Sequence, residues 1–322
     1  MKTFENGFKE FIESQLPIFD DILAEKQIPL SKRPFEAACY FVNYCIVEIK
    51  GDTKEKFLEK EWFKSIYKLI KQWYKERYAD SLKITDEHIV LGVFLIYKTP
   101  FQLKIPLSIA QEKVGNDKRW FCLPNSVLDC ENIIDWIENK PNMGNLSGDE
   151  LNEIKKMVFD IATNIRSTHV NLMSASFEKG LHKISNTIQA HMDKAAHDIL
   201  SLEAGKISTS YWEIHLAIEK TIKLIILQNG RSHQNKHNLG TLCKIANSIN
   251  GIKFDCSIFS NFPSDDEAIK QRYGEGNNFT IHEAVNNFIS AYEVISKLTN
   301  LLKKQFTMDN ARLLIAIPPW DK

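Results

Sequence analysis

Apolar residues recur at steps of three and four over long stretches of the second half of the chain. The most regular stretch contains Ile281, Ala284, Phe288, Ala291, Ile295, Leu298 and Leu302. This period predicts a helix with one buried face, suited to antiparallel helix packing. Residues 149–201 follow the same spacing with Gly180 as an interior break, as one long helix or two stacked helices. Because only 13 Gly and 10 Pro occur in 322 residues, a mainly α fold is favoured over many short strands.

The first half combines helices with a short β segment. Apolar residues at helical spacing predict helices over residues 1–80. Residues 89–97 are instead β-branched and aromatic, and residues 101–109 alternate at a period of two. With Thr99-Pro100 between them, these runs predict a β-hairpin with one buried face. Residues 119–123 suit a third strand, and residues 127–139 predict a short helix.

The strongest turn-forming run in the chain, KPNMGNLSG, covers residues 140–148. Gly, Pro and Asn at this density mark a connection between folded parts, so we expect a domain boundary there. Residues 1–146 would form a mixed helical domain with a small β-hairpin, and residues 147–322 a helical bundle led by a long helix. Capping-box spacing marks two predicted helix starts, at Ser147 with Glu150 and at Thr280 with Glu283.

Composition excludes several classes of protein. The 41 Lys+Arg balance 41 Asp+Glu, which argues against a strongly basic nucleic-acid coat but leaves room for a local basic groove. The longest apolar run has nine residues, 89–97, whereas a membrane helix needs about 20. We therefore expect no membrane partner, and the N-terminus does not read as a secretory signal. Six Cys without a Cys-x2-Cys pair predict reduced thiols and a cytoplasmic location.

The sequence offers no clear site for a cofactor or a metal. It has no glycine-rich phosphate loop of either common type, so no cofactor is expected. One alternative is a zinc set drawn from His233, His237, Cys243 and Cys256, but this spacing matches no common finger. We therefore expect no metal site.

Three short signatures follow one another in the second half. They are Ala217–Lys223 (AIEKTIK), His237-Asn238-Leu239 and Arg272-Tyr273. In this order and spacing, residues 190–305 resemble the HEPN superfamily (higher eukaryotes and prokaryotes nucleotide-binding domain), a small all-α bundle. The resemblance covers about a third of the chain. It implies an RNA- or nucleotide-binding module, a homodimer, and a place in a bacterial defence or toxin–antitoxin system with an antitoxin partner protein.

The resemblance also implies a candidate reaction. Nucleases of this family are metal-independent endoribonucleases that pair an Arg with a His, with four to six residues between them. Arg offers a fork of donors to a phosphate, and His exchanges a proton near neutral pH. After Arg272 and four intervening residues, position 277 is Asn, and the next His is His282. Arg231 and His237 have the family spacing, but they fall in the loop after the second helix of the bundle. The candidate catalytic residues are therefore Arg272 with His282, or Arg231 with His237.

A polar groove is the second candidate site. Lys220, Lys223, His233 and Tyr273 are the expected ligand-binding residues. The alternative is that Lys220 and Lys223 form the solvated side of an amphipathic helix. Three functions follow: a binding module for RNA or a nucleotide, a dimeric endoribonuclease, or a non-enzymatic protein-interaction or structural protein.

Overall fold

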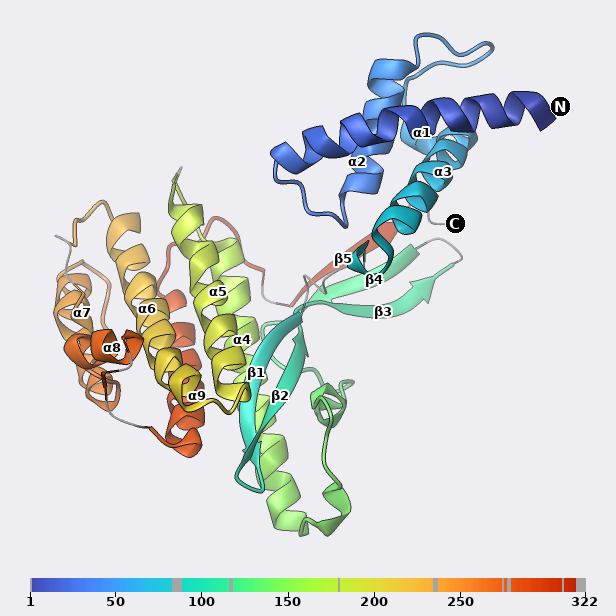
Figure 1. The fold of residues 1–322 in the computed structure, drawn as a ribbon. Helices are drawn as coiled ribbons and strands as arrows, with labels where there is room; N and C mark the ends of the chain where they lie inside the picture. Colours follow the sequence, from blue (N-terminus) through green and yellow to red (C-terminus); the bar gives the residue numbers. More distant parts are fainter. Residues whose placement is uncertain are drawn as a thin grey trace. The chain divides into compact units, whose positions relative to one another are not determined.

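The computed structural model describes residues 2–82, 89–115, 118–178, 180–233, 237–273, 275–276, 279–308 and 310–316. Its contacts divide the chain into two compact units (Figure 1). Unit 1 contains residues 1–87, 112–119 and 314–322, and unit 2 contains residues 88–111 and 120–313. Helices dominate and the sheets are small, so the expected mainly α fold is confirmed.

Unit 1 is built on three helices that contact one another. They are α1 (Lys2–Glu25), α2 (Arg33–Tyr40) and α3 (Glu61–Tyr78), with short helical turns at Phe41–Cys45, Phe57–Glu59 and Ala79–Leu82. Residues at helical spacing fill its core: Ile12, Leu16, Phe19 and Leu23 from α1, and Phe63, Ile66, Ile70 and Tyr74 from α3. The buried carboxylate of Asp20 accepts hydrogen bonds from Arg33 and Tyr78.

Unit 2 contains six helices within the described residues. They are α4 (Gly148–Ser174), α5 (Leu181–Leu200), α6 (Ala204–Gln228), α7 (Leu239–Asn247), α8 (Asp265–Arg272) and α9 (Ile281–Thr299). The central helix is α6, which contacts α5, α7, α8 and α9 (Figure 1). This position explains why most residues of α6 are buried, including polar ones.

The helix starts follow the sequence, and the long stretch resolves into two helices. Capping boxes form at Ser147 with Glu150 and at Thr280 with Glu283, as predicted. The regular stretch of residues 149–201 is divided between α4 and α5. Gly180, with φ +105°, precedes α5 in a conformation that glycine tolerates.

The predicted hairpin is present and packs on helices. Strands β1 (Ile89–Ile96) and β2 (Thr99–Pro106) pair antiparallel, and β1 contacts α4, α5 and α9. The turn lies at Tyr97 and Lys98, both with positive φ, rather than at Thr99-Pro100. Two left-handed residues are what a tight two-residue hairpin turn requires. A Cβ at Gly92 would lie 3.1 Å from Ile105 and Ile161, so glycine lets β1 approach α4 closely.

A second sheet contains three strands in the order β3-β4-β5. They are β3 (Ile109–Val114), β4 (Lys118–Leu123) and β5 (Ala311–Ala316). The predicted strand at residues 119–123 therefore exists, in a sheet separate from the hairpin. The helix predicted over 127–139 is wrong, since only a 3-10 turn forms there, at Ile133–Trp136. At the start of the predicted helix, a side chain takes the place of backbone hydrogen bonding: the Glu131 carboxylate accepts the Leu128 N–H at 2.9 Å.

The division into units differs from the boundary predicted at residues 146 and 147. Hairpin residues share one hydrophobic core with the helices of unit 2, among them Val93, Phe94, Leu103, Ile105, Val158 and Ile161. The turn-forming run contains only a 3-10 turn, at Met143–Asn145, before α4 begins. Its Gly and Pro mark a connection inside unit 2. Turn-forming residues indicate the local backbone conformation, but they do not indicate whether the segments on either side share a hydrophobic core.

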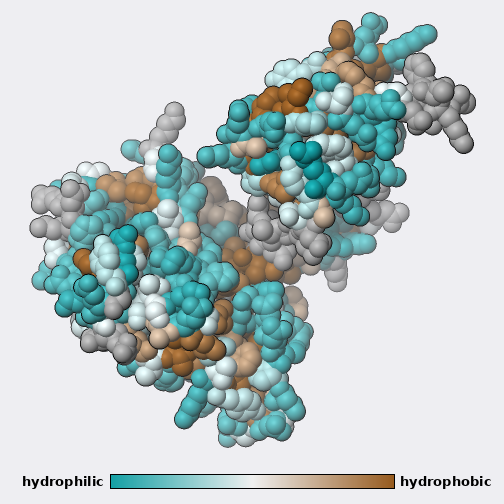
Figure 2. Space-filling view, viewed as in Figure 1, coloured by the Kyte–Doolittle hydropathy of each residue, from teal (hydrophilic) through white to brown (hydrophobic). Residues whose placement is uncertain are grey.

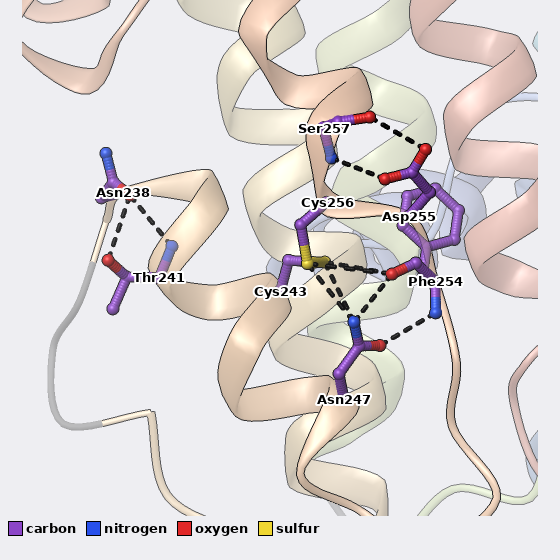
Figure 3. The surroundings of a disulfide bond; sticks show 8 residues. All are labelled: Asn238, Thr241, Cys243, Asn247, Phe254, Asp255, Cys256 and Ser257. Carbon is purple, nitrogen blue, oxygen red and sulfur yellow. Dashed lines mark hydrogen bonds between the residues drawn. A yellow bond between two sulfur atoms is a disulfide. The ribbon is translucent and has the colours of Figure 1, made fainter.

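A disulfide joins Cys243 of α7 to Cys256, so the expectation of reduced thiols is wrong for this pair (Figure 3). Their Cα atoms lie 5.8 Å apart. Asn247 fastens the same loop, because its amide donates to the Phe254 carbonyl at 2.7 Å and accepts the Phe254 N–H at 2.9 Å. The two sulfurs bond to each other, which removes them from the zinc set considered above.

The surface is mainly hydrophilic on the face that Figure 2 shows, with scattered hydrophobic residues on both units. Among the described helices, none combines the length and the apolar character needed to cross a bilayer.

Candidate functional site

Helix α6 buries two carboxylates. Glu213 is 8% exposed and Glu219 is 5% exposed. A buried carboxylate is costly unless positive or hydrogen-bonding partners surround it. The Glu219 carboxylate lies 2.6 Å from Lys223 Nζ and 3.2 Å from His237 Nδ1, with His215 Nε2 at 3.8 Å. Glu219 therefore gathers residues from α6 and from the loop before α7.

Glu213 organises a second set that reaches α5. Its carboxylate lies 2.6 Å from His191 Nδ1 and 3.0 Å from Lys194 Nζ. Burial opposes ionisation, but these hydrogen bonds outweigh it and lower the pKa of Glu213. A carboxylate only accepts hydrogen bonds, so His191 donates from Nδ1, and in the neutral imidazole Nε2 is then an acceptor. That atom lies 2.7 Å from Lys220 Nζ.

A cavity of about 320 Å³ lies between α5 and α6. Its lining combines cations, one carboxylate and apolar groups: Lys183, Ile184, Thr187, Glu219, Lys220, Lys223, Leu227 and His233. Helices α5 and α6 pack side by side (Figure 1) and provide two walls of the cavity. Three lysines oppose one carboxylate, which gives the cavity an excess of positive charge.

Two basic side chains of the cavity have lowered pKa values. Burial lowers the pKa of Lys220 against the opposing charges of Glu219 and Glu213, and the charge of Lys223 adds a smaller lowering effect. Burial and the same Lys223 charge lower the pKa of His233. Within the described part of the chain, His233 Nδ1 is buried and makes no hydrogen bond. An anion in the cavity would raise both pKa values and supply a charge partner.

The structure brings part of the predicted site together. Lys220, Lys223 and His233 line the same cavity, and His237 is joined to it through Glu219. The Arg272 guanidinium lies 5.3 Å from the Trp212 ring and 5.7 Å from the Tyr273 ring. Trp212 shares the α6 face with Glu219 but precedes it by seven residues, a rise of roughly 10 Å. Arg272 and Tyr273, both exposed, thus lie farther along that face, outside the cavity lining.

Neither proposed Arg–His pair is hydrogen-bonded together among the residues that the structure describes. His282 is exposed, contacts Asn286 at 3.2 Å, and lines a different cavity of about 190 Å³. Arg231 is exposed beyond the end of α6. Across the ranges described, no hydrogen bond links Arg272 to His282 or Arg231 to His237. Asn277, where the family motif has His, lies outside the described residues. The catalytic pairing therefore stays a prediction.

Sequence reasoning does not identify several polar residues of the site, among them Lys183, Thr187, His191 and Glu213. Lys183, Thr187 and His191 recur every four residues on α5, so they share one face of that helix. That spacing is a usable signal. The register of α5 against α6, which brings this face to Lys220, is tertiary and has no sequence signature of its own.

A second cavity, of about 440 Å³, lies at the starts of α7 and α8. His215, 3% exposed, lines it together with Asn238, Ser264 and Asp265. Its Nδ1 atom makes no hydrogen bond among the residues described. Burial lowers the pKa of His215 despite the opposing charge of Glu219, which favours the neutral imidazole.

Stability should fall on acidification because of His215. The folded-state pKa is below the ordinary value of about 6.5, so below that pH the unfolded chain binds more protons. The loss amounts to about 1.4 kcal/mol per unit of pKa difference. Urea unfolding at pH 8 and pH 5 should show a smaller pH effect in His215→Phe than in wild type. The His282→Phe control should keep the wild-type difference, and equal pH effects in His215→Phe and wild type would contradict the assignment.

Comparison with known proteins returned no matching family model, curated protein or solved structure. The resemblance to the HEPN superfamily stays a prediction.

Proposed function

We propose that unit 2 binds a phosphate group of a nucleotide or of RNA in the cavity between α5 and α6. The observation that carries this proposal is that Lys183, Lys220, Lys223 and His233 line one cavity with a single carboxylate. Ammonium groups are strong donors to phosphate oxygens, and His233 Nδ1 lacks a partner among the described groups. This is the first of the three functions that the sequence suggests.

The size and lining of the cavity favour part of a single nucleotide. About 320 Å³ is at the lower end of the ~300–1,000 Å³ typical of ligand pockets. Ile184 and Leu227 provide apolar wall, which suits a ribose or base edge, and Thr187 adds a hydroxyl. A phosphate at the end of an RNA strand or in a free nucleotide has the matching chemistry. A homodimer, an antitoxin partner and a role in defence remain predictions.

Removing positive charge from the cavity should weaken binding strongly. Lys223→Gln deletes a cation and leaves the Glu219 carboxylate without its closest partner. A hydrogen bond to a charged group contributes about 1.5–3 kcal/mol, so we expect a loss of roughly 10- to 150-fold. Lys183→Gln, at the exposed rim of the cavity, should lose less. Fluorescence anisotropy with a 5′-phosphorylated, labelled oligoribonucleotide, and competition by AMP, measure the affinity.

A matched control separates the cavity from general charge effects. Lys206 also lies on α6 but pairs with Glu203 at 2.8 Å on an exposed surface. Lys206→Gln should bind as wild type does, and binding should weaken as salt rises. Equal losses in Lys206→Gln and Lys223→Gln, or no binding by wild type at low salt, would exclude the cavity as the phosphate site. RNA cleavage in EDTA, lost in Arg272→Ala or Arg231→Ala, would instead support the endoribonuclease.

A further inference from the structure

Lys220, in the cavity wall, is linked to two side chains behind it in a hydrogen-bonded chain that simple phosphate binding does not need. Glu213 holds His191 at 2.6 Å, and His191 Nε2 lies 2.7 Å from Lys220 Nζ. We propose that Lys220 is an amine nucleophile that forms an imine with a small anionic aldehyde or 2-oxo acid, with His191 as the proton-transferring base. The proposal rests on the proposed function to the extent that the same cavity holds the anionic group of the carbonyl compound.

The order of this hydrogen-bonded chain fixes the role of each member. The Glu213 carboxylate can only accept, so it takes the Nδ1–H of His191 and leaves Nε2 free to receive a proton from Lys220. A nucleophile within hydrogen-bond reach of a base, itself oriented by a third group, is the general arrangement of nucleophilic catalysis. The His191 and Glu213 side chains are largely buried, which holds both in place. Glu213 is a positioning residue.

The surroundings of Lys220 make its ammonium group easier to deprotonate. Its side chain lines the cavity beside Ile184 and Leu227. Burial and the charge of Lys223 lower its pKa, while Glu219 and Glu213 act in the opposite sense. The Glu213 carboxylate also pairs with Lys194, and the Glu219 carboxylate pairs with Lys223 and His237. Of the cavity's lysines, Lys220 has a base at its nitrogen, whereas Lys223 donates to a carboxylate.

The step balances without an added oxidant or reductant. His191 Nε2 takes one proton from the Lys220 ammonium, and the amine lone pair attacks the carbonyl carbon. A C–N bond forms as the carbonyl π pair moves to oxygen, and a proton passes from nitrogen to that oxygen. Protonated His191 then returns its proton to the hydroxyl, which leaves as water while the nitrogen lone pair completes a protonated imine. The sum is ammonium plus carbonyl giving iminium plus water.

The neighbours of Lys220 select the class of carbonyl compound. Lys183, Lys223 and His233 line the same cavity, so a phosphate or carboxylate on the ligand would be bound a few atoms from the reacting carbon. A neutral aldehyde would lack that contact. We therefore expect anionic carbonyl compounds to react faster than neutral ones.

Imine trapping tests the proposal on the full chain. Pyridoxal 5′-phosphate supplies an aldehyde, a phosphate and an imine chromophore, and borohydride reduction fixes any adduct for peptide mass spectrometry. We expect a dominant adduct on Lys220 in wild type and none at that position in Lys220→Arg. Pyridoxal, which lacks the phosphate, should form the adduct more slowly. His191→Gln should lower the rate of imine formation by about 100-fold. Glu213→Gln should move the pH dependence of that rate, a readout that a purely structural role would not change.

The outcomes separate this inference from the proposed function. Adducts spread evenly over exposed lysines, with Lys206 as reactive as Lys220, would overturn the imine proposal even if AMP still binds. An adduct on Lys220 that forms equally fast with pyridoxal and is not slowed by AMP would support the reactive amine and overturn the phosphate site. If Lys220→Arg does not fold, the position of the adduct in wild type decides.

Discussion

Replacing Arg166 by Met should lower the free energy of unfolding of unit 2 by about 3–5 kcal/mol. Arg166 is fully buried, and its guanidinium makes five hydrogen bonds, of 2.6–3.0 Å, to the carbonyls of Pro106 and Ser126 and to the Glu131 carboxylate. It also lies 4.8 Å from the Trp136 ring. Met would leave the buried carboxylate and both carbonyls without this donor. Urea unfolding followed by tryptophan fluorescence measures the loss.

An exposed ion pair provides the control for this prediction. Lys297 and Glu293 lie 2.6 Å apart with side chains 56% and 50% exposed, so Lys297→Met should cost less than about 1 kcal/mol. The double variant Arg166→Met/Glu131→Leu should recover part of the loss, because it removes the unpaired charge. Similar losses of unfolding free energy in Arg166→Met and Lys297→Met would show that the buried Arg166–Glu131 pair does not stabilise unit 2 more than an exposed pair does.

Removing the disulfide should cost about 3 kcal/mol, the value for a closed loop of roughly 15 residues. Cys243 and Cys256 are 13 positions apart, and the bond holds the loop that follows α7 (Figure 3). The variant Cys243→Ala/Cys256→Ala should unfold at lower urea concentration than wild type. Wild type treated with a thiol reductant should unfold at the same concentration as the variant.

A free cysteine and a thiol count complete the test. Cys130 is exposed and free, so Cys130→Ala should change stability by less than about 0.5 kcal/mol. Thiol titration of the unfolded, unreduced chain should find four thiols, since the sequence has six cysteines and two are bonded. A count of six thiols, or stability unaffected by reductant, would contradict the bond.

Local chemistry explains which parts of the fold were predictable. The seam of α9 and both capping boxes were predicted because spacing and side-chain hydrogen bonds act within a few residues. The conformation of the segment after residue 127 was not predicted. The Glu131 carboxylate accepts a backbone N–H there, and its main partner, Arg166, is 35 positions away in the sequence. The pairing of Cys243 with Cys256 likewise depends on where the chain after α7 turns, which no Cys spacing motif indicates.

The candidate site follows the same division. Lys220 and Lys223 were identified because they occur together in one helical signature, and His233 because it lies in the loop that follows. Glu213 was missed, because a single carboxylate in an apolar helix gives no indication of its partner until α5 is placed beside it. The Arg–His spacing was recognisable in the sequence. It did not predict the neighbours of these side chains, because those depend on how the helices of the bundle pack.

Histidine signals followed by NMR during a titration with AMP test the phosphate site most directly. The structure places His233 in the cavity and His191 and His237 in contact with Lys220 and Glu219, whereas His282 lines a different cavity. We predict that the Cε1–H signals of His191, His233 and His237 shift together with one dissociation constant, while that of His282 stays fixed. Unchanged signals for the first three at saturating AMP, or a shift of His282 alone, would contradict the account.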